Sequence, residues 1–239
     1  MRLPRFPWRP SLPRRPVPIL LTVAVAVLAP ILALRTAQGL EEGPPWHDCL
    51  GQQKTYRSSS PSMAPLLPEG EAASFECFDH AAFFGSRVAA SSIALNTLHP
   101  TLQAGDVVTF RVPAEYGRGT WAKRVIGLPG DVVEIRAGRL LVNGRTADLD
   151  PAGTFTPAPG QGAPRPISRE TLPNGRSYVI LAEAAPREAN MPAVTVPAGH
   201  LFVLGDFRDR SLDSRVGRFG FVPVSHLIAR LPPGSERAL

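Results

Sequence analysis

Lysine is scarce in this sequence. Among its 26 lysines and arginines, only Lys54 and Lys123 are lysines, so arginine serves at nearly every position that needs a positive charge. A guanidinium cannot lose its proton in a protein, whereas a buried lysine can do so and act as a base. The scarcity therefore makes Lys123, which lies in an apolar segment, a candidate for chemistry rather than for charge alone.

Cysteine is equally rare, with only Cys49 and Cys77. Neither belongs to a cysteine and histidine pattern with zinc-ligand spacing, so the sequence indicates no metal site. Outside the cytoplasm two cysteines can form a disulfide, but spacing alone does not show that their Cβ atoms meet. A disulfide and two separate buried thiols both stay open.

Acidic residues are missing from the first sixteen positions, which hold five arginines, and the next eighteen residues, 17–34, carry no charge. A helix of that length spans about 27 Å, close to the hydrocarbon core of a bilayer. We expect one transmembrane anchor, with the arginines in the cytoplasm and the rest of the chain on the other side. A cleaved signal peptide and a buried helix are the alternatives, and the length of the run favours the anchor.

The net charge of +6 comes largely from this N-terminal arm. Without its five arginines the rest of the chain is nearly balanced, which argues against a nucleic-acid partner. Attraction to anionic lipid headgroups explains the arm better. Membrane lipids are therefore an expected partner.

Long helical patterns are absent from the rest of the chain, and no internal repeat is evident. The 27 prolines and 21 glycines alternate with short apolar runs, which favours a loop-rich, mostly β protein. We expect a turn at 128–131 and a long surface excursion between 148 and 176. The expected regular elements are strands at 55–61, 105–112, 121–128, 178–182 and 201–204, a hairpin of 132–135 with 140–142, and a short helix at 223–230.

The apolar segment around Lys123 would allow this lysine to act as a general base. A lysine amine must lose its proton before it can deprotonate a serine hydroxyl, and burial lowers its pKa by disfavouring the charged form. Strand alternation places Trp121, Lys123 and Val125 on one face, so the amine would lie among apolar neighbours. A surface lysine on a half-exposed strand is the plainer alternative. For Ser62, an ordinary turn serine before Pro65 is the corresponding alternative.

Four segments together resemble the ordered sequence boxes of type I signal peptidases. They are Ser60-Pro61-Ser62-Met63-Ala64-Pro65-Leu66-Leu67, Gly105-Asp106-Val107-Val108-Thr109-Phe110, residues 123–131 beginning Lys123-Arg124-Val125, and residues 205–215 beginning Gly205-Asp206-Phe207-Arg208-Asp209. Gly220-Phe221-Val222-Pro223 is also similar to the family. With the expected anchor, the resemblance covers residues 17 to 230.

The resemblance implies a membrane-bound serine endopeptidase that acts on secretory preproteins. Ser62 would be the nucleophile and Lys123 the general base. The Ser62 N–H and the Ser60 hydroxyl would form the oxyanion hole. Ser211 would orient the lysine amine, and two ion pairs, Asp213 with Arg215 and Asp206 with Arg124, would support the site. Met63 would contact the substrate or support its groove. A gap-filling core methionine is the alternative for Met63.

The resemblance also implies an architecture, a location and substrates. We expect a signal-peptidase-like catalytic β core at 54–136 and 200–230, an inserted smaller β-rich subdomain at 137–199, and a tail at 231–239. The arm at 1–16, the anchor at 17–34 and a linker at 35–53 precede the core. The protein would lie in a bacterial inner membrane, with its catalytic domain on the periplasmic or extracytoplasmic side, and an organellar inner membrane is the alternative. It would cut after Ala-x-Ala-like sites and need neither metal nor other cofactor.

The chain departs from the family pattern at several positions. Phe207 and Arg210 stand where asparagines are usual, Pro61 replaces a common glycine, and Leu66 replaces a common threonine. No catalytic atom is lost, but the hydrogen bonding of the last turn would change. Reduced activity or unusual specificity is therefore a hypothesis. Two other functions are kept as alternatives: a serine/lysine autoprotease, and a non-catalytic or weakly active membrane-tethered β domain that binds signal sequences.

Overall fold

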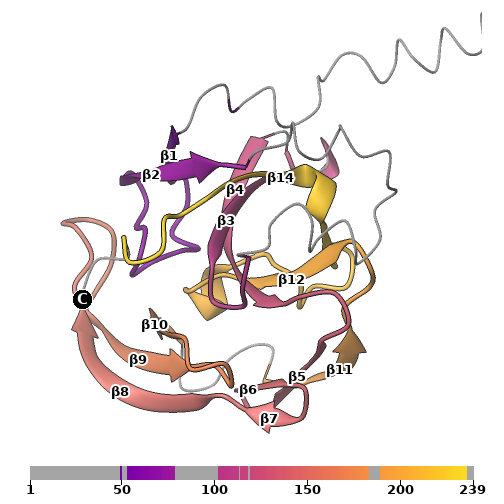
Figure 1. Ribbon diagram of the computed structural model, residues 1–239. Helices are drawn as coiled ribbons and strands as arrows, with labels where there is room; N and C mark the ends of the chain where they lie inside the picture. Colours follow the sequence, from indigo (N-terminus) through magenta and orange to yellow (C-terminus); the bar gives the residue numbers. More distant parts are fainter. Residues whose placement is uncertain are drawn as a thin grey trace, which may run out of the picture. The chain divides into compact units, whose positions relative to one another are not determined.

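The largest element of the fold is a seven-stranded antiparallel sheet (Figure 1). The computed structural model describes residues 49, 53–78, 102–112, 114–117, 119–182 and 189–235. Strand order in this sheet is β1-β2-β14-β3-β4-β12-β13. The bounds are β1 Gln53–Arg57, β2 Ala72–Cys77, β3 Val107–Val112, β4 Gly119–Gly127, β12 His200–Leu204, β13 Val222–Pro223 and β14 Leu227–Arg230.

Two smaller antiparallel sheets complete the β structure. The four-stranded sheet has the order β11-β5-β6-β7, and the three-stranded sheet has the order β10-β9-β8. Three single-turn 3-10 helices also occur in the described residues. The bounds are β5 Val132–Arg136, β6 Arg139–Val142, β7 Arg145–Thr146, β8 Asp148–Phe155, β9 Arg165–Thr171, β10 Ser177–Ile180, β11 Met191–Thr195, η2 Ala114–Tyr116, η3 Arg208–Arg210 and η4 Val224–His226.

The mostly β prediction is confirmed, and most of the expected strands are present. The hairpin of β5 and β6 turns at Ala137 and Gly138, whose φ angles are 47° and 76°. Positive φ at both turn residues matches the right-handed twist of the strands, which is why glycine is favoured there. The predicted turn at 128–131 is also present, closed by the hydrogen bond from Asp131 N to Leu128 O.

One expectation for regular structure is wrong. Residues 223–230 are not a helix: only η4 is helical, and β14 inserts between β2 and β3. Pairing with these distant strands overrides the local signal. In the expected surface excursion at 148–176, the consecutive strands β8 and β9 pair and form the long curved ribbon of Figure 1. The first expected strand also ends early, at Arg57.

Apolar side chains from different sheets share one core. Ile126 of β4 and Phe202 of β12 pack in the same cluster as Val133 of β5 and Tyr178 of β10. A second cluster, with Val125 and Leu201, lies on the other face of the large sheet. The smaller sheets are therefore held against the large sheet by burial of apolar surface.

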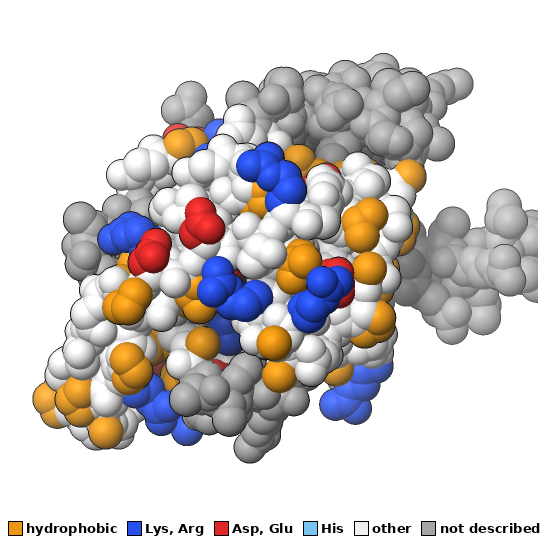
Figure 2. Space-filling model, turned by 90° about the horizontal axis from the view of Figure 1, so that it is seen from below, with side chains coloured by type: hydrophobic (Ala, Val, Ile, Leu, Met, Phe, Trp, Pro, Cys, Tyr) orange, Lys and Arg blue, Asp and Glu red, His pale blue; other side chains and the backbone are white. Residues whose placement is uncertain are grey.

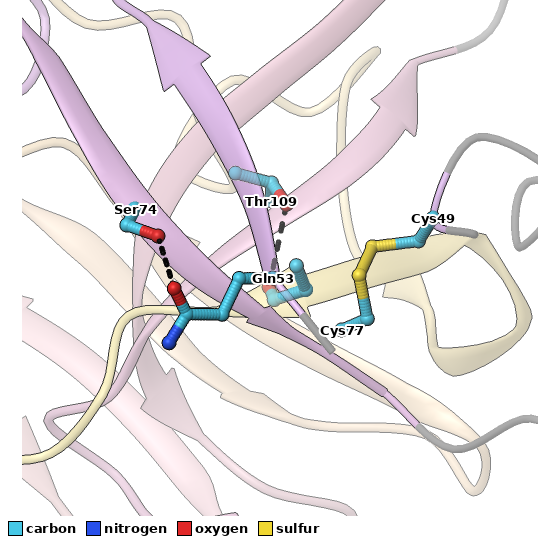
Figure 3. The surroundings of a disulfide bond; sticks show 6 residues. Cys49, Gln53, Ser74, Cys77 and Thr109 are labelled. Carbon is cyan, nitrogen blue, oxygen red and sulfur yellow. Dashed lines mark hydrogen bonds between the residues drawn. A yellow bond between two sulfur atoms is a disulfide. The ribbon is translucent and has the colours of Figure 1, made fainter. Parts of the chain in front are cut away.

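A disulfide joins Cys49 to Cys77 at the end of β2 (Figure 3), with a Cα–Cα distance of 5.7 Å. This resolves the alternative that the sequence left open. Beside it, Ser74 Oγ donates to Gln53 Oε1 over 3.1 Å, across the β1–β2 pair. The disulfide therefore ties Cys49, which precedes β1, to β2 near the edge of the large sheet.

The expected anchor at 17–34 and the arm before it lie outside the described residues. Within the described ranges, no helix has the length and hydrophobicity needed to cross a membrane. The predicted division into catalytic core, insertion and tail stays a prediction. One strand assigned to the core by that division, β5, pairs with β6 and β11 in the four-stranded sheet.

Figure 2 shows one face of the molecule with its side chains coloured by type. On this face the Lys and Arg side chains are spread among hydrophobic and uncharged groups, with a few acidic side chains between them. They do not form one continuous basic patch there.

Candidate active site

Lys123 and Ser62 meet in the interior although 61 residues separate them. Lys123 Nζ donates a 2.7 Å hydrogen bond to Ser62 Oγ and a 3.1 Å hydrogen bond to the carbonyl of Ala122. The side chains are close to fully buried, with 3% of Lys123 and 8% of Ser62 exposed. The contact places a nucleophile within proton-transfer distance of a nitrogen base.

The position of Lys123 on β4 explains its burial. Lys123 pairs with Val108 of β3, in the middle of the seven-stranded sheet. Its Nζ lies 5.5 Å from the centre of the Trp121 ring, on the face that strand alternation predicted. A surface lysine is therefore excluded.

The surroundings make the amine less basic. Burial lowers the pKa of Lys123 from 10.5 to about 8, although the carboxylates of Asp213 and Asp206 act in the opposite direction. A lysine with this pKa is deprotonated in a useful fraction of molecules near neutral pH, whereas an exposed lysine is not.

The turn that carries Ser62 follows β1 and is closed by backbone hydrogen bonds. Ala64 N donates to Pro61 O over 2.9 Å, and Leu67 N donates to Met63 O over 2.8 Å. Ser60 Oγ donates to Ser62 Oγ over 3.1 Å. Among the described residues, the Ser62 N–H has no hydrogen-bond acceptor. A serine hydroxyl and a backbone N–H therefore lie next to the nucleophile.

Residues 205–215 pack directly against this turn. Phe207 N donates to Ser62 O over 3.1 Å. A Cβ at Gly205 would lie only 2.5 Å from Ser62 O and 2.2 Å from Ser211 Oγ, so the close approach needs glycine. Residues 205–215, the last of the segments that resemble the family, thus pack against the backbone of Ser62.

The two predicted ion pairs are present and buried. Arg124 donates to both carboxylate oxygens of Asp206, over 2.8 and 2.7 Å, and also to Gly105 O over 2.7 Å. Arg215 donates to Asp213 over 2.8 and 2.9 Å, and Asp213 accepts from Gly205 N over 3.0 Å. Together they tie β4, the 205–215 turn and the loop before β3 into one frame around Lys123.

Two predicted site residues differ from expectation. The buried Ser211 Oγ has no hydrogen-bond partner in the described part of the chain, so here it does not orient the lysine amine. It packs against Gly205 instead. Met63 is 1% exposed and lies in a core cluster with Phe75 and Leu67, which fits the alternative of a gap-filling core methionine.

Two further residues, Glu170 of β9 and Tyr178 of β10, support the site without having been predicted from the sequence. Glu170 pairs with Arg208 in the 205–215 turn and accepts a 2.6 Å hydrogen bond from Tyr178. The Tyr178 ring in turn lies 4.0 Å from the Arg124 guanidinium. Glu170 lies in the segment predicted to be a surface excursion, where an acidic residue carries no signal of its own.

The departures at Phe207 and Arg210 leave the turn's backbone hydrogen bonds in place. Arg210 N donates to Phe207 O over 3.0 Å, and Arg208 N donates to Leu181 O over 2.8 Å. Phe207 is buried with Ala64, Ile167 and Leu181 in an apolar cluster. Backbone hydrogen bonds and apolar packing therefore hold the turn in this protein. Altered activity or specificity stays a prediction.

A cavity of about 260 Å³ opens onto the serine and lysine. Side chains from β1, β4 and the two turns line it. They include Tyr56, Ser60, Trp121, Ala122, Arg210 and Leu212. In the described residues, no group of three or more His, Cys, Asp or Glu side chains could hold a metal ion.

Comparison with known proteins places this site in a family. Residues 51–232 match the family described as signal peptidase, peptidase S26. The chain is 37% identical over 136 residues to signal peptidase I of Rickettsia prowazekii and 38% identical over 136 residues to that of Rickettsia akari. These matches cover 54% of this chain and 50% and 49% of those proteins, so the chain spans about half the length of these relatives.

A crystal structure of a signal peptidase I from Enterococcus faecalis is 27% identical, with a TM-score of 0.32, and the match covers 55% of this chain and 97% of that one. The family match covers most of the chain and contains Ser62, Lys123 and the whole 205–215 turn. Because this family match covers more than half of the sequence, the chain belongs to the signal peptidase family, peptidase S26.

Proposed function

We propose that the protein is a serine endopeptidase that removes N-terminal signal peptides from secreted preproteins, with Ser62 as nucleophile and Lys123 as general base. The observation that carries the proposal is the buried 2.7 Å contact between Lys123 Nζ and Ser62 Oγ. The lowered pKa of Lys123, about 8, supports the same role. Family membership supports the reaction class.

The reaction begins with the neutral amine of Lys123 accepting the Ser62 hydroxyl proton along this contact. Ser62 Oγ then forms a bond to the scissile carbonyl carbon, and the carbonyl π electrons move to its oxygen. As the C–N bond breaks, Lys123 returns the proton to the leaving amine, which leaves an acyl-enzyme. Water, deprotonated by the same amine, hydrolyses the ester and frees Ser62.

The developing oxyanion would accept hydrogen bonds from the Ser62 N–H and the Ser60 hydroxyl. Across the residues that the structure describes, no group accepts from the Ser62 N–H, and Ser60 Oγ lies 3.1 Å from Ser62 Oγ; both observations support this assignment. Donors fixed beside a reacting carbonyl stabilise charge that appears only in the transition state. Each such donor typically contributes about 100- to 1,000-fold to the rate.

The substrate would bind as an extended strand along the cavity at the dyad. Small side chains at alternate positions, as in an Ala-x-Ala site, would fit a cavity walled by Trp121 and Tyr56. We infer that residues 17–34 anchor the protein in a bacterial inner membrane with the catalytic part on the periplasmic side. The anchor would hold the enzyme at high effective concentration near cleavage sites that emerge from the same membrane.

The test is cleavage of a preprotein carrying an Ala-x-Ala site by the detergent-solubilised full chain. We expect Ser62→Ala and Lys123→Ala each to abolish cleavage, because each removes one half of the dyad. Lys54→Ala is the matched control, since it removes the only other lysine. If the folded, unaltered protein cuts none of several preproteins, the proposal fails and binding of signal sequences without turnover replaces it.

A further inference from the structure

A second cavity, of about 310 Å³, borders the same turn as the dyad. Ser60 and Ser62 line the first cavity, whereas Pro61 and Ala64 line the second, so the turn separates the two. Arg210 lines both. A peptide bound across Ser62 can therefore pass from one cavity to the other beside Arg210.

The second cavity combines an apolar wall with positive charge. Phe207 forms the wall, and it is 6% exposed. The guanidinium carbons of Arg165 and Arg210 lie 5.5 and 5.9 Å from the Phe207 ring centre, within cation–π distance. Glu69 also lines the cavity, which leaves two arginines against one glutamate and a net charge of +1.

The position of this cavity suggests which part of a substrate reaches it. The cavity at the dyad takes the residues that precede the scissile bond under the function proposed above. Residues on the other side of that bond advance by about 3.3 Å each in an extended chain, so the first three lie within about 10 Å of Ser62. Pro61, which borders the second cavity, is the direct neighbour of Ser62.

We propose that the second cavity is a subsite for an acidic side chain within the first three residues after the scissile bond. The methylene groups of a glutamate would pack on Phe207, and its carboxylate would accept hydrogen bonds from Arg210 and Arg165. Hydrogen bonds between a guanidinium and a carboxylate are among the strongest that side chains form. The inference rests on the peptidase function and adds a specificity determinant to it.

The experiment compares matched preproteins that differ only by Glu or Gln at the first, second or third residue after the scissile bond. We expect kcat/KM of the full chain to be about tenfold higher for Glu than for Gln at one of these positions, which corresponds to one charge-assisted hydrogen bond. Arg210→Gln should reduce that ratio toward one. Arg210→Glu should reverse the preference in favour of Lys at the same position.

Arg145→Gln is the control, because it removes the same charge from an exposed arginine that lines neither cavity. It should leave the Glu-to-Gln ratio unchanged. Equal rates for Glu and Gln at all three positions would overturn the subsite while leaving the peptidase function standing. If none of the preproteins is cut, the peptidase function fails and the subsite fails with it.

Discussion

Glu170 of β9 and Arg208 in the 205–215 turn form a two-point ion pair, with Nη1–Oε1 and Nη2–Oε2 distances of 2.9 and 2.5 Å. Both side chains are buried. Burial alone would raise the pKa of Glu170, but the Arg208 guanidinium outweighs it and the pKa is lowered. The carbonyl of Arg208 accepts a hydrogen bond from Arg215, which pairs with Asp213. The pair thus connects the three-stranded sheet to the frame around Lys123.

Glu170→Gln should destabilise the protein, because it leaves the Arg208 guanidinium buried without a counter-charge. Removing one partner of a buried pair costs about 3 to 5 kcal/mol. Urea unfolding of the full chain in detergent measures the change. Glu134→Gln is the control, since Glu134 pairs with an Arg136 side chain that is 68% exposed and such pairs contribute about 1 kcal/mol or less. Equal losses in the two variants would contradict the special role of the buried pair.

Gly205→Ala should disturb the nucleophile. The added Cβ would lie 2.5 Å from Ser62 O, so either Ser62 or the 205–215 turn must move. We expect a loss of about 1 to 3 kcal/mol in unfolding free energy from overpacking. A shift of about 1 Å at a reacting group can lower the rate roughly 100-fold. Gly217→Ala, where nothing lies within 4 Å of the new Cβ, should change neither quantity in the same unfolding and cleavage assays. Wild-type cleavage by Gly205→Ala would show that the turn adapts.

The rate of cleavage should rise with pH through about 8, the lowered pKa of Lys123, because only the neutral amine can accept the Ser62 proton. A pH profile of kcat/KM on one preprotein, at constant ionic strength, measures this ionisation. A profile that stays flat between pH 6 and 10, about two units on either side of that pKa, would argue against Lys123 as the base.

Lys123→Met should stabilise the protein at low pH. The folded-state pKa of Lys123 is lowered to about 8, whereas the unfolded chain keeps a value near 10.5, so the unfolded state binds more protons between these values. Stability of the unaltered protein therefore rises with pH across that window. Below pH 8 the variant escapes a penalty of about 3 kcal/mol, and the gain should shrink toward pH 10. Unfolding curves for both proteins at pH 6 and 10 test this, and a pH-independent difference would contradict it.

Reduction of the Cys49–Cys77 disulfide should lower stability. The bond closes a loop with a sequence separation of 28, and restricting the unfolded chain over such a loop is worth about 3 to 4 kcal/mol. Thermal unfolding with and without dithiothreitol gives the change. The double variant Cys49→Ser/Cys77→Ser should unfold at the temperature of the reduced protein and show no response to the reductant. An unchanged unfolding temperature on reduction would mean that the loop is already held by other contacts.

The sequence alone indicated the candidate serine and lysine pair and determined the class of fold. The scarcity of lysine singled out Lys123, and strand alternation placed it on the same face as Trp121, because side chains of a strand point alternately to its two faces. Proline, glycine and short apolar runs indicated a β protein, and Ala137-Gly138 between two apolar runs marked the β5–β6 hairpin. These features depend on local geometry, which neighbouring residues encode.

Only the tertiary structure decided which distant residues meet. No local pattern in residues 148–176 indicates that β8 and β9 pair, or that Glu170 lies opposite Arg208, since both depend on contacts between separate segments. The same holds for β14, whose residues pair with β2 and β3 instead of forming a helix. The 2.7 Å contact of Lys123 with Ser62 spans 61 residues, and burial of that contact, which lowers the lysine pKa, exists only once the sheets have packed together.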